Sequence, residues 1–306
     1  MGKFDKIFTI NGEVPQNSVE TPQPQEVVIE EVPTVTETHV AESGDKWETN
    51  EINVIELKDI TLKFGDYTLF NKLNLTIPDF KNRGQFITIL GGSGSGKSCI
   101  ARLITNLESP TSGERKLYGK PYDDKTHIPM VFQSYSSYPW ASVEENIALP
   151  MKLKGIDEET IQNYTSRLID AVGLRGHEKK YAQTPPLSGG QLQRVALARA
   201  LATNSPIIVL DEFSSGLDLN TKTAMDEMLY KIYCDKEVDR TFILITHDIS
   251  EALFLSQRIF VLSSKTHTFS KIIDIDYNVD YRNRNEIISH PKYKEYYNQI
   301  EEALAE

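Results

Sequence analysis

The chain has 306 residues, and its hydrophobic share of 39% and charged share of 25% are ordinary for a globular protein large enough to bury a core. Its net charge of −11 comes mostly from residues 1–50, which carry −7, and no basic tract marks a nucleic-acid surface. Two cysteines are too few for a disulfide framework, and no apolar run approaches the roughly 18–20 residues that span a bilayer. We therefore expect a cytoplasmic protein that does not bind nucleic acid and reaches a membrane only through a partner.

The first predicted segment is an acidic tail over residues 1–50, interrupted by four prolines and without a sustained apolar period. Such a segment buries too little surface to offset the entropy of ordering it, so we expect it to be disordered. β-rich pieces follow at residues 54–57, 61–64 and 73–77. A mostly apolar strand is expected over 85–90.

A glycine-rich turn connects that strand to a helix expected over 97–107. It matches the pattern Gly-x4-Gly-Lys-Ser in full and consists of Gly91, Gly92, Ser93, Gly94, Ser95, Gly96, Lys97 and Ser98. Glycines allow successive backbone N–H groups to wrap around phosphates, Lys97 offers a positive charge to the β- and γ-phosphates, and Ser98 offers a hydroxyl to Mg²⁺. A glycine turn that merely begins a helix would not need the Lys-Ser pair.

A second glycine turn lies far along the chain, after a region of about 134–186 in which we expect helices at 143–149 and 158–172. This turn opens a helix over 190–202 and consists of Leu187, Ser188, Gly189, Gly190 and Gln191. Its backbone N–H groups can face another anion. Because a nucleoside triphosphate has one terminal phosphate, two such turns suggest a phosphate held from two sides.

Two acidic residues, Asp211 and Glu212, end the apolar strand expected over 207–210. Adjacent carboxylates at a strand end are costly unless a cation or a proton compensates them. After a phosphate loop, the pattern predicts that Asp211 binds Mg²⁺ through water and that Glu212 is the general base for an attacking water. The alternative is a solvated Asp-Glu turn.

Three further residues are candidates for the same site. His247 follows the strand over 242–246 in a Thr-His-Asp setting, which favours a γ-phosphate sensor over a structural histidine. Gln133 is a neutral amide that can bind Mg²⁺ and orient water. Phe64, on an early strand, is predicted either to stack on adenine or to pack in the core.

With these residues in place, the chain strongly resembles the ATP-binding cassette (ABC) ATPases over about residues 53–275. The first glycine turn is similar to the Walker A motif, residues 187–191 to the family signature, and Asp211-Glu212 to Walker B with its catalytic glutamate. Gln133 resembles the Q-loop glutamine, residues 215–218 the D-loop and His247 the switch histidine. Phe213 departs from the family, which usually has proline there.

The resemblance implies an α/β fold with a P-loop NTPase (RecA-like) core, an antiparallel β-subdomain and an inserted helical subdomain near 134–186. The chain would divide into the tail (1–50), an ATPase domain (51–280) and a helical C-terminal extension (281–306). ATP and Mg²⁺ would bind in a head-to-tail homodimer, with Ser188, Gly189, Gly190, Gln191 and Asp218 closing over nucleotide held by the other copy.

The implied function is the ATP-hydrolysing subunit of a membrane transporter, peripheral on the inner face of the cell membrane. Its partners would be separate permease chains and, for an importer, a solute-binding protein. Residues 133–143, with Pro139-Trp140, are similar to cassettes of nitrate, sulfonate and taurine importers, whereas residues 146–155 resemble lipoprotein-release and macrolide-efflux cassettes. A soluble non-transport ATPase and an efflux-type cassette remain the alternatives.

Overall fold

The structure is a computed structural model, and it describes residues 49–81, 83–133, 137–181, 187–234, 239–279 and 282–305. The acidic tail expected over 1–50 lies outside these residues except for Thr49 and Asn50. Asn50 is bound to Asp79, because its backbone N–H donates to the Asp79 carbonyl at 2.7 Å and its side-chain amide donates to the Asp79 carboxylate at 2.5 Å.

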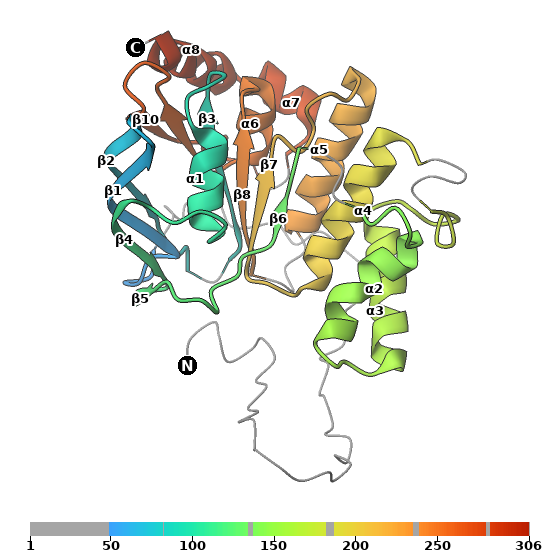
Figure 1. Ribbon diagram of the computed structural model, residues 1–306. Coiled ribbons are helices and arrows are strands. Elements are labelled where there is room, and N and C mark those ends of the chain that lie inside the picture. The colour runs from blue at the N-terminus through green and yellow to red at the C-terminus, as the bar shows by residue number, and fades with distance from the viewer. Residues whose placement is uncertain are drawn as a thin grey trace, which may run out of the picture. The chain divides into compact units, whose positions relative to one another are not determined.

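A six-stranded sheet forms the centre of the fold, in the order β10-β9-β3-β8-β7-β6 (Figure 1). All neighbouring pairs are parallel except β9 and β10. The expected strands over 85–90, 207–210 and 242–246 are confirmed. The strands are β3 (Gln85–Gly91), β6 (Met130–Val131), β7 (Ile207–Asp211), β8 (Thr241–Thr246), β9 (Arg258–Leu262) and β10 (Phe269–Asp274).

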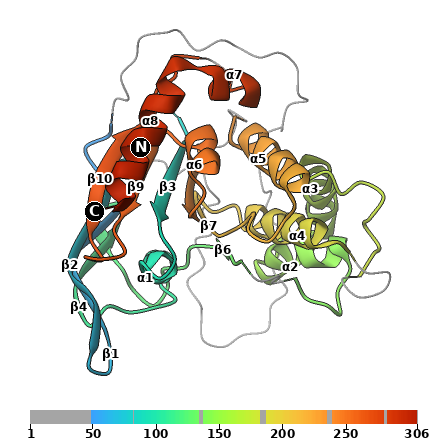
Figure 2. The same cartoon turned by 90° about the horizontal axis from the view of Figure 1, so that it is seen from above.

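The strands of this sheet are buried on both faces, which is why they read as continuous apolar runs. Alternate residues enter two different hydrophobic clusters: Phe86 and Leu90 belong to one, and Ile87 and Ile89 to the other. Figures 1 and 2 show α1 (Lys97–Ile104) on one side of the sheet and α5 (Leu219–Cys234) and α6 (Ile249–Leu255) on the other. The helix expected over 97–107 is thus confirmed but ends earlier.

A second sheet is antiparallel and follows the order β2-β1-β4-β5. Its strands are β1 (Ile55–Phe64), β2 (Tyr67–Ile77), β4 (Ser112–Leu117) and β5 (Lys120–Pro121). The separate strands expected over 54–57 and 61–64 are one strand, and that prediction was wrong. The polar pair between them, Lys58-Asp59, sits at an irregularity in the register, and Asp59 has a φ of 52°. A bulge interrupts the alternation without ending the strand.

Three helices pack together beyond the β6 edge of the main sheet: α2 (Val143–Leu153), α3 (Glu158–Ala171) and α4 (Gly189–Ala202). Both expected helices of the 134–186 region are confirmed, but residues 172–181 form a loop rather than helix. Side chains cap the helix starts: Ser142 accepts from the backbone N–H of Glu145, and Asp157 from that of Thr160.

The C-terminal helices are α7 (Arg284–Ser289) and α8 (Pro291–Ala305), so the helix expected from residue 290 is confirmed and a shorter one precedes it. Two arginines join this end of the chain to the core. Arg282 donates to the carbonyls of Phe254 and Ser256 at 2.8 and 2.7 Å, and Arg284 binds the fully buried carboxylate of Asp226 at 2.7 Å. Burial, reinforced by Glu251, raises the pKa of Asp226, and Arg284 opposes that rise.

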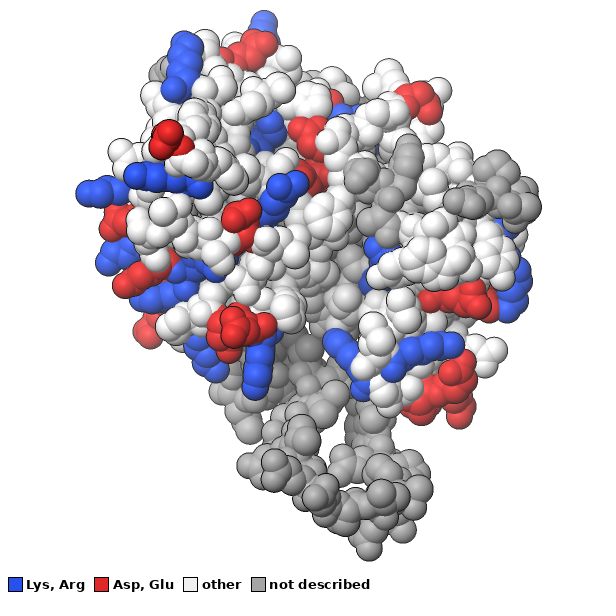
Figure 3. Space-filling view, in the orientation of Figure 1, with Lys and Arg blue, Asp and Glu red and all other residues white. Residues whose placement is uncertain are grey.

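Charges are mixed on the face of the molecule seen in Figure 3, where lysine, arginine, aspartate and glutamate alternate without a field of one sign. Within the described ranges, no helix combines the length and the apolar character needed to cross a bilayer.

Candidate functional site

The phosphate loop leaves the end of β3 and enters α1 at Lys97. Gly96 caps this helix with a φ of 101°, and a Cβ there would lie 2.7 Å from the ring of Phe70, so only glycine fits. No side chain caps the helix start, which leaves its first N–H groups available to an anion. The ammonium of Lys97 donates to the carbonyl of Gly92 at 2.8 Å, so the lysine folds back over its own loop.

The hydroxyl of Ser98 donates to the carboxylate of Asp211 at 3.1 Å, which joins α1 to the end of β7. Asp211 is only 7% exposed. Burial raises the pKa of Asp211, the Ser98 hydrogen bond opposes this, and the neighbouring Glu212 adds to the rise. The hydrogen bond from Ser98 compensates the charge of this buried carboxylate only in part. A carboxylate next to a hydroxyl suits a divalent cation, which prefers oxygen ligands. In the described part of the chain, no group of three or more His, Cys, Asp or Glu is placed to hold a metal ion.

Glu212 lies between two nitrogen-bearing side chains. Its carboxylate is 2.8 Å from Nδ1 of His247, and Oε1 is 3.9 Å from the ammonium of Lys97. Burial lowers the pKa of Lys97, while Glu212 and Asp211 counteract that effect. Glu212 has a φ of 50°, an uncommon conformation for a residue with a Cβ, and its backbone N–H donates to Ile245 at the end of β8.

Strand topology explains why residues so distant in sequence meet here. β3 and β7 both pair in parallel with β8, so their carboxyl ends lie along one edge of the sheet. The phosphate loop follows β3, Asp211-Glu212 ends β7, and His247 follows β8. The structure therefore brings Lys97, Ser98, Asp211, Glu212 and His247 together, as their spacing along the chain predicted.

Two supporting residues were missed from the sequence. Glu251 is 1% exposed and accepts from the hydroxyls of Ser214 at 2.5 Å and Thr246 at 2.6 Å, joining the segments next to Glu212 and His247. The signal that could have revealed it is an acidic residue in α6, where every other residue except Ser250 is apolar. His267, in the β9–β10 connection, places Nδ1 2.9 Å from the carbonyl of Ser95 in the phosphate loop.

The second glycine turn forms the start of α4. Ser188 accepts from the backbone N–H of Gln191 at 3.3 Å, and the Ser188 N–H donates to the Gln191 side chain at 2.9 Å, which is a capping box. Ser188 is exposed, whereas Gly190 is buried so closely that a Cβ would lie 2.8 Å from Thr221. In Figures 1 and 2, α1 and α4 lie on either side of β6 and β7, so the two turns of one chain are separate sites.

Comparison with known proteins identifies the family to which the chain belongs. Residues 70–215 match the family described as ABC transporter. The chain is 36% identical to the nitrate import ATP-binding protein NrtD of Synechocystis sp. over 230 residues, which cover 72% of this chain and 82% of that protein. This chain belongs to the ABC transporter ATPase family. The resemblance inferred from the motifs is confirmed.

Other relatives of this ABC ATPase are longer. It is 37% identical to the Fe(3+) ions import ATP-binding protein FbpC of Escherichia coli O157:H7, with 69% of this chain and 60% of that protein covered, so it spans well under two thirds of that relative. Among solved structures, a dimeric bacterial ABC transporter cassette is 31% identical with a TM-score of 0.63, covering 72% of this chain and 99% of that one. The expected fold, an α/β P-loop NTPase with RecA-like core, is confirmed.

Three other predicted site residues lie on separate elements of this ABC ATPase. Phe64 is 48% exposed at the end of β1, so the alternative of core packing is wrong. Gln133 is exposed just after β6, where its carbonyl accepts from Gln193 at 3.0 Å. The Asp218 carboxylate accepts from Thr221 and from the first N–H groups of α5, so it caps that helix.

Phe213, which replaces the usual proline, is 1% exposed and belongs to the hydrophobic cluster beneath α4, α5 and α6.

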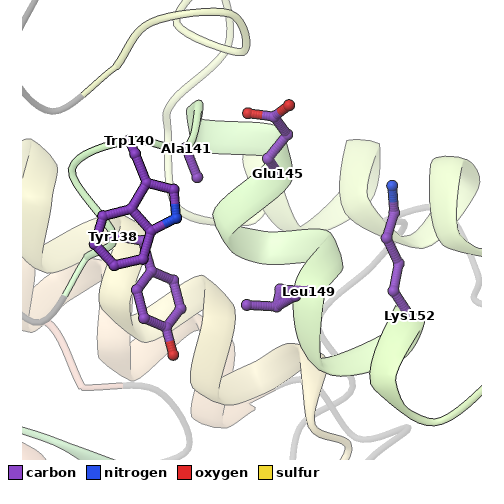
Figure 4. A pocket seen from close by; sticks show the side chains of 6 residues that line it. All are labelled: Tyr138, Trp140, Ala141, Glu145, Leu149 and Lys152. Carbon is purple, nitrogen blue, oxygen red and sulfur yellow. The ribbon is translucent and has the colours of Figure 1, made fainter.

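A pocket of about 320 Å³ lies beside α2, and Figure 4 shows aromatic rings from the preceding loop facing side chains of that helix. Trp140 is 74% exposed there, and its ring centroid is 5.1 Å from that of Tyr138. The pocket thus joins an apolar wall to a charged rim. It is lined by Tyr138, Trp140, Ala141, Glu145, Leu149 and Lys152.

Proposed function

We propose that this protein is the ATP-binding and ATP-hydrolysing subunit of a membrane ABC transporter that imports a small solute. The observation that carries the proposal is the position of Glu212, 2.8 Å from His247 and 3.9 Å from the phosphate-loop Lys97. Glu212 as general base, His247 as its orienting partner and Lys97 as the phosphate-binding cation lie together at the carboxyl ends of the parallel strands. This arrangement suits attack of water on a terminal phosphate.

In the proposed reaction, the N–H groups of residues 91–98 and the Lys97 ammonium hold the β- and γ-phosphates. Ser98, Asp211 and Gln133 would hold Mg²⁺, which supplies charge neutralisation at the phosphates when bound. Glu212 takes a proton from water as the water oxygen bonds to the γ-phosphorus and the bond to the ADP oxygen breaks. His247 keeps the Glu212 carboxylate oriented and contacts the γ-phosphate, and Phe64 stacks on adenine.

The proposed active unit is a head-to-tail homodimer. Ser188 is exposed on α4, away from the phosphate loop of its own chain, so it is available to nucleotide bound by a second copy. Gly189, Gly190, Gln191 and Asp218 would reach the interface with it. A related cassette has been solved as a dimer, and another structure of that cassette is a post-hydrolysis dimer bound to ADP and phosphate.

The proposed partners are permease chains, with a solute-binding protein outside the membrane, and the pocket around Trp140 is the proposed docking point. An aromatic, exposed hollow fits an apolar segment of another protein. The protein would then sit on the cytoplasmic face of the cell membrane. Relatives named for iron, nitrate and spermidine/putrescine import match at 36–38% identity, so the proposal names a small solute without choosing among them.

We further propose the domain division of the sequence analysis, with the tail at 1–50, the ATPase domain at 51–280 and the helical extension at 281–306.

The test is phosphate release and light scattering by the purified chain with ATP and MgCl₂, with EDTA as the control. We expect magnesium-dependent phosphate release and a dimer that forms with ATP. A chain that neither self-associates nor releases phosphate, alone or with permeases encoded beside it, would overturn the proposal. For docking, Trp140→Ala should leave basal ATP hydrolysis unchanged and remove its stimulation by the permease.

A further inference from the structure

One histidine outside the described catalytic edge contacts the signature turn directly. His177 lies in the loop between α3 and α4, and its Nε2 is 2.9 Å from the side-chain nitrogen of Gln191. His177 and Gln191 are both partly buried. The contact therefore holds a side chain of the capping box from outside the helix.

The capping box determines which atom of Gln191 faces His177. The backbone N–H of Ser188 lies 2.9 Å from Oε1 of Gln191, and an N–H can only donate, so Oε1 must be the acceptor there. The amide nitrogen of Gln191 is then left to donate to Nε2 of His177. His177 must accept at Nε2 and carry its proton on Nδ1, which lies 3.4 Å from the carbonyl of Arg175.

The loop that carries His177 is also fastened to the first turn of α2. The backbone N–H of Val143 donates to the carbonyl of Lys180 at 2.9 Å, and that of Glu144 to the carbonyl of Glu178 at 3.1 Å. Lys179 forms an ion pair with Glu144. Because α2 also lines the pocket around Trp140, the loop contacts both the pocket helix and the signature turn.

We propose that His177 is a positioning residue for the signature turn: as a hydrogen-bond acceptor, it holds Gln191 in the capping box. Through Gln191 it sets the direction in which Ser188 and the first N–H groups of α4 face the phosphate bound by a second copy. The proposal rests on the proposed function, because the turn acts only in the ATP-bound dimer. Removing the acceptor frees the Gln191 amide to rotate, and the Ser188 N–H then loses its partner.

The experiment asks whether residue 177 must accept or donate a hydrogen bond. Substitutions at residue 177 are made in the Glu212→Gln chain, which is expected to dimerise without hydrolysing ATP, first with the native Gln191 and then with Gln191→Glu. His177→Leu removes the acceptor, His177→Gln keeps one, and His177→Lys offers only donors. In the second background, Gln191→Glu leaves only acceptors at residue 191, so a donor at residue 177 is then the matching partner. The readouts are the ATP concentration for half-maximal dimerisation by light scattering, nucleotide affinity of the monomer by calorimetry, and the melting temperature.

We expect His177→Leu and His177→Lys to raise the half-maximal ATP concentration about fivefold, the factor that corresponds to losing a helix cap, while monomer affinity stays unchanged. His177→Gln should keep the half-maximal ATP concentration close to that of the chain with the native His177. With Gln191→Glu, His177→Lys should dimerise at a lower ATP concentration than His177→Leu, whereas the two should be equal with the native Gln191.

The role of His177 as a positioning acceptor is wrong if the substitutions at residue 177 change only the melting temperature. It is also wrong if the variants rank in the same order of half-maximal ATP concentration with Gln191 and with Gln191→Glu. If the Glu212→Gln chain with the native His177 fails to dimerise with ATP, the proposed function fails first and the role of His177 falls with it.

Discussion

The catalytic edge and the signature turn are the two proposed phosphate-binding regions, and they are built differently. At the edge, Lys97 and Asp211 are buried, and Ser98, Glu212 and His247 are already paired with them or with each other inside one chain. The signature turn is exposed at Ser188 and depends on side-chain hydrogen bonds from its own helix and from a neighbouring loop. In the proposed function, the residues that carry the chemistry lie at the end of a buried sheet. The turn that would complete the site lies at a helix start, which would have to meet a second copy.

This difference separates the expected effects of substitutions. A change at the edge alters what one chain does with nucleotide, because β3, β7 and β8 are buried on both faces and leave little room to adjust. On the proposed function, a change at the signature turn should alter the association of two chains and leave nucleotide binding to the monomer intact.

The largest effect is expected for Glu212→Gln, which removes the general base and keeps the shape of the side chain. Phosphate release should fall by about a hundredfold or more, since that is the ordinary contribution of a positioned base. ATP affinity should remain, and light scattering should detect a long-lived dimer. Turnover within a few-fold of the native rate would show that another group accepts the proton.

Lys97→Ala should weaken ATP binding to the monomer by about ten- to hundredfold, the usual cost of losing hydrogen bonds to a charged group. The loss also leaves Glu212 without a cation at 3.9 Å. Calorimetry with ATP and with ADP measures the effect. Unchanged affinity would place the phosphates away from this lysine.

Ser188→Ala should raise the ATP concentration needed for dimerisation about fivefold in the Glu212→Gln background, because the first turn of α4 loses its cap. Monomer affinity for ATP should not change, and Ser188→Thr, which keeps the hydroxyl, is the control. A fall in monomer affinity would contradict the separation of the two regions.

The smallest effect is expected for Phe64→Ala, which should weaken ATP binding about two- to tenfold through loss of stacking. Because Phe64 is 48% exposed, the melting temperature should stay unchanged. Phe64→Tyr should preserve affinity, and binding of inorganic tripolyphosphate should be unaffected by either substitution. Equal losses for ATP and tripolyphosphate would move Phe64 from the adenine to the phosphate end.

Much of the edge could be predicted from the sequence because parallel strands place consecutive motifs at one end of a sheet. The runs at 207–210 and 242–245 are apolar throughout. Asp211 follows the first directly, and His247 follows the second after Thr246. A signal was also available but overlooked for α5, since Met225, Met228 and Leu229 recur at helical spacing.

Other features could not be read from spacing. Glu251 bonds to Ser214, 37 residues away, and His267 to Ser95, 172 residues away, so only the folded chain pairs them. The bulge at Asp59 depends on strand register and resembles a turn in the sequence. The polarity of the contact between His177 and Gln191 follows from a hydrogen-bond network, which no pattern of residue types encodes.

The contacts that Arg282 and Arg284 make with the core matter for any truncated form of this protein. A polypeptide ending at residue 280 would keep every predicted site residue. It would, however, leave the buried Asp226 carboxylate without its arginine partner and the carbonyls of Phe254 and Ser256 without the Arg282 donor. These losses fall on α5 and α6, the two helices that follow the D-loop and His247. Truncation at residue 280 would therefore disturb the helices that support the proposed nucleotide site. Residues 281–306 should be kept in any protein that is used for enzyme assays.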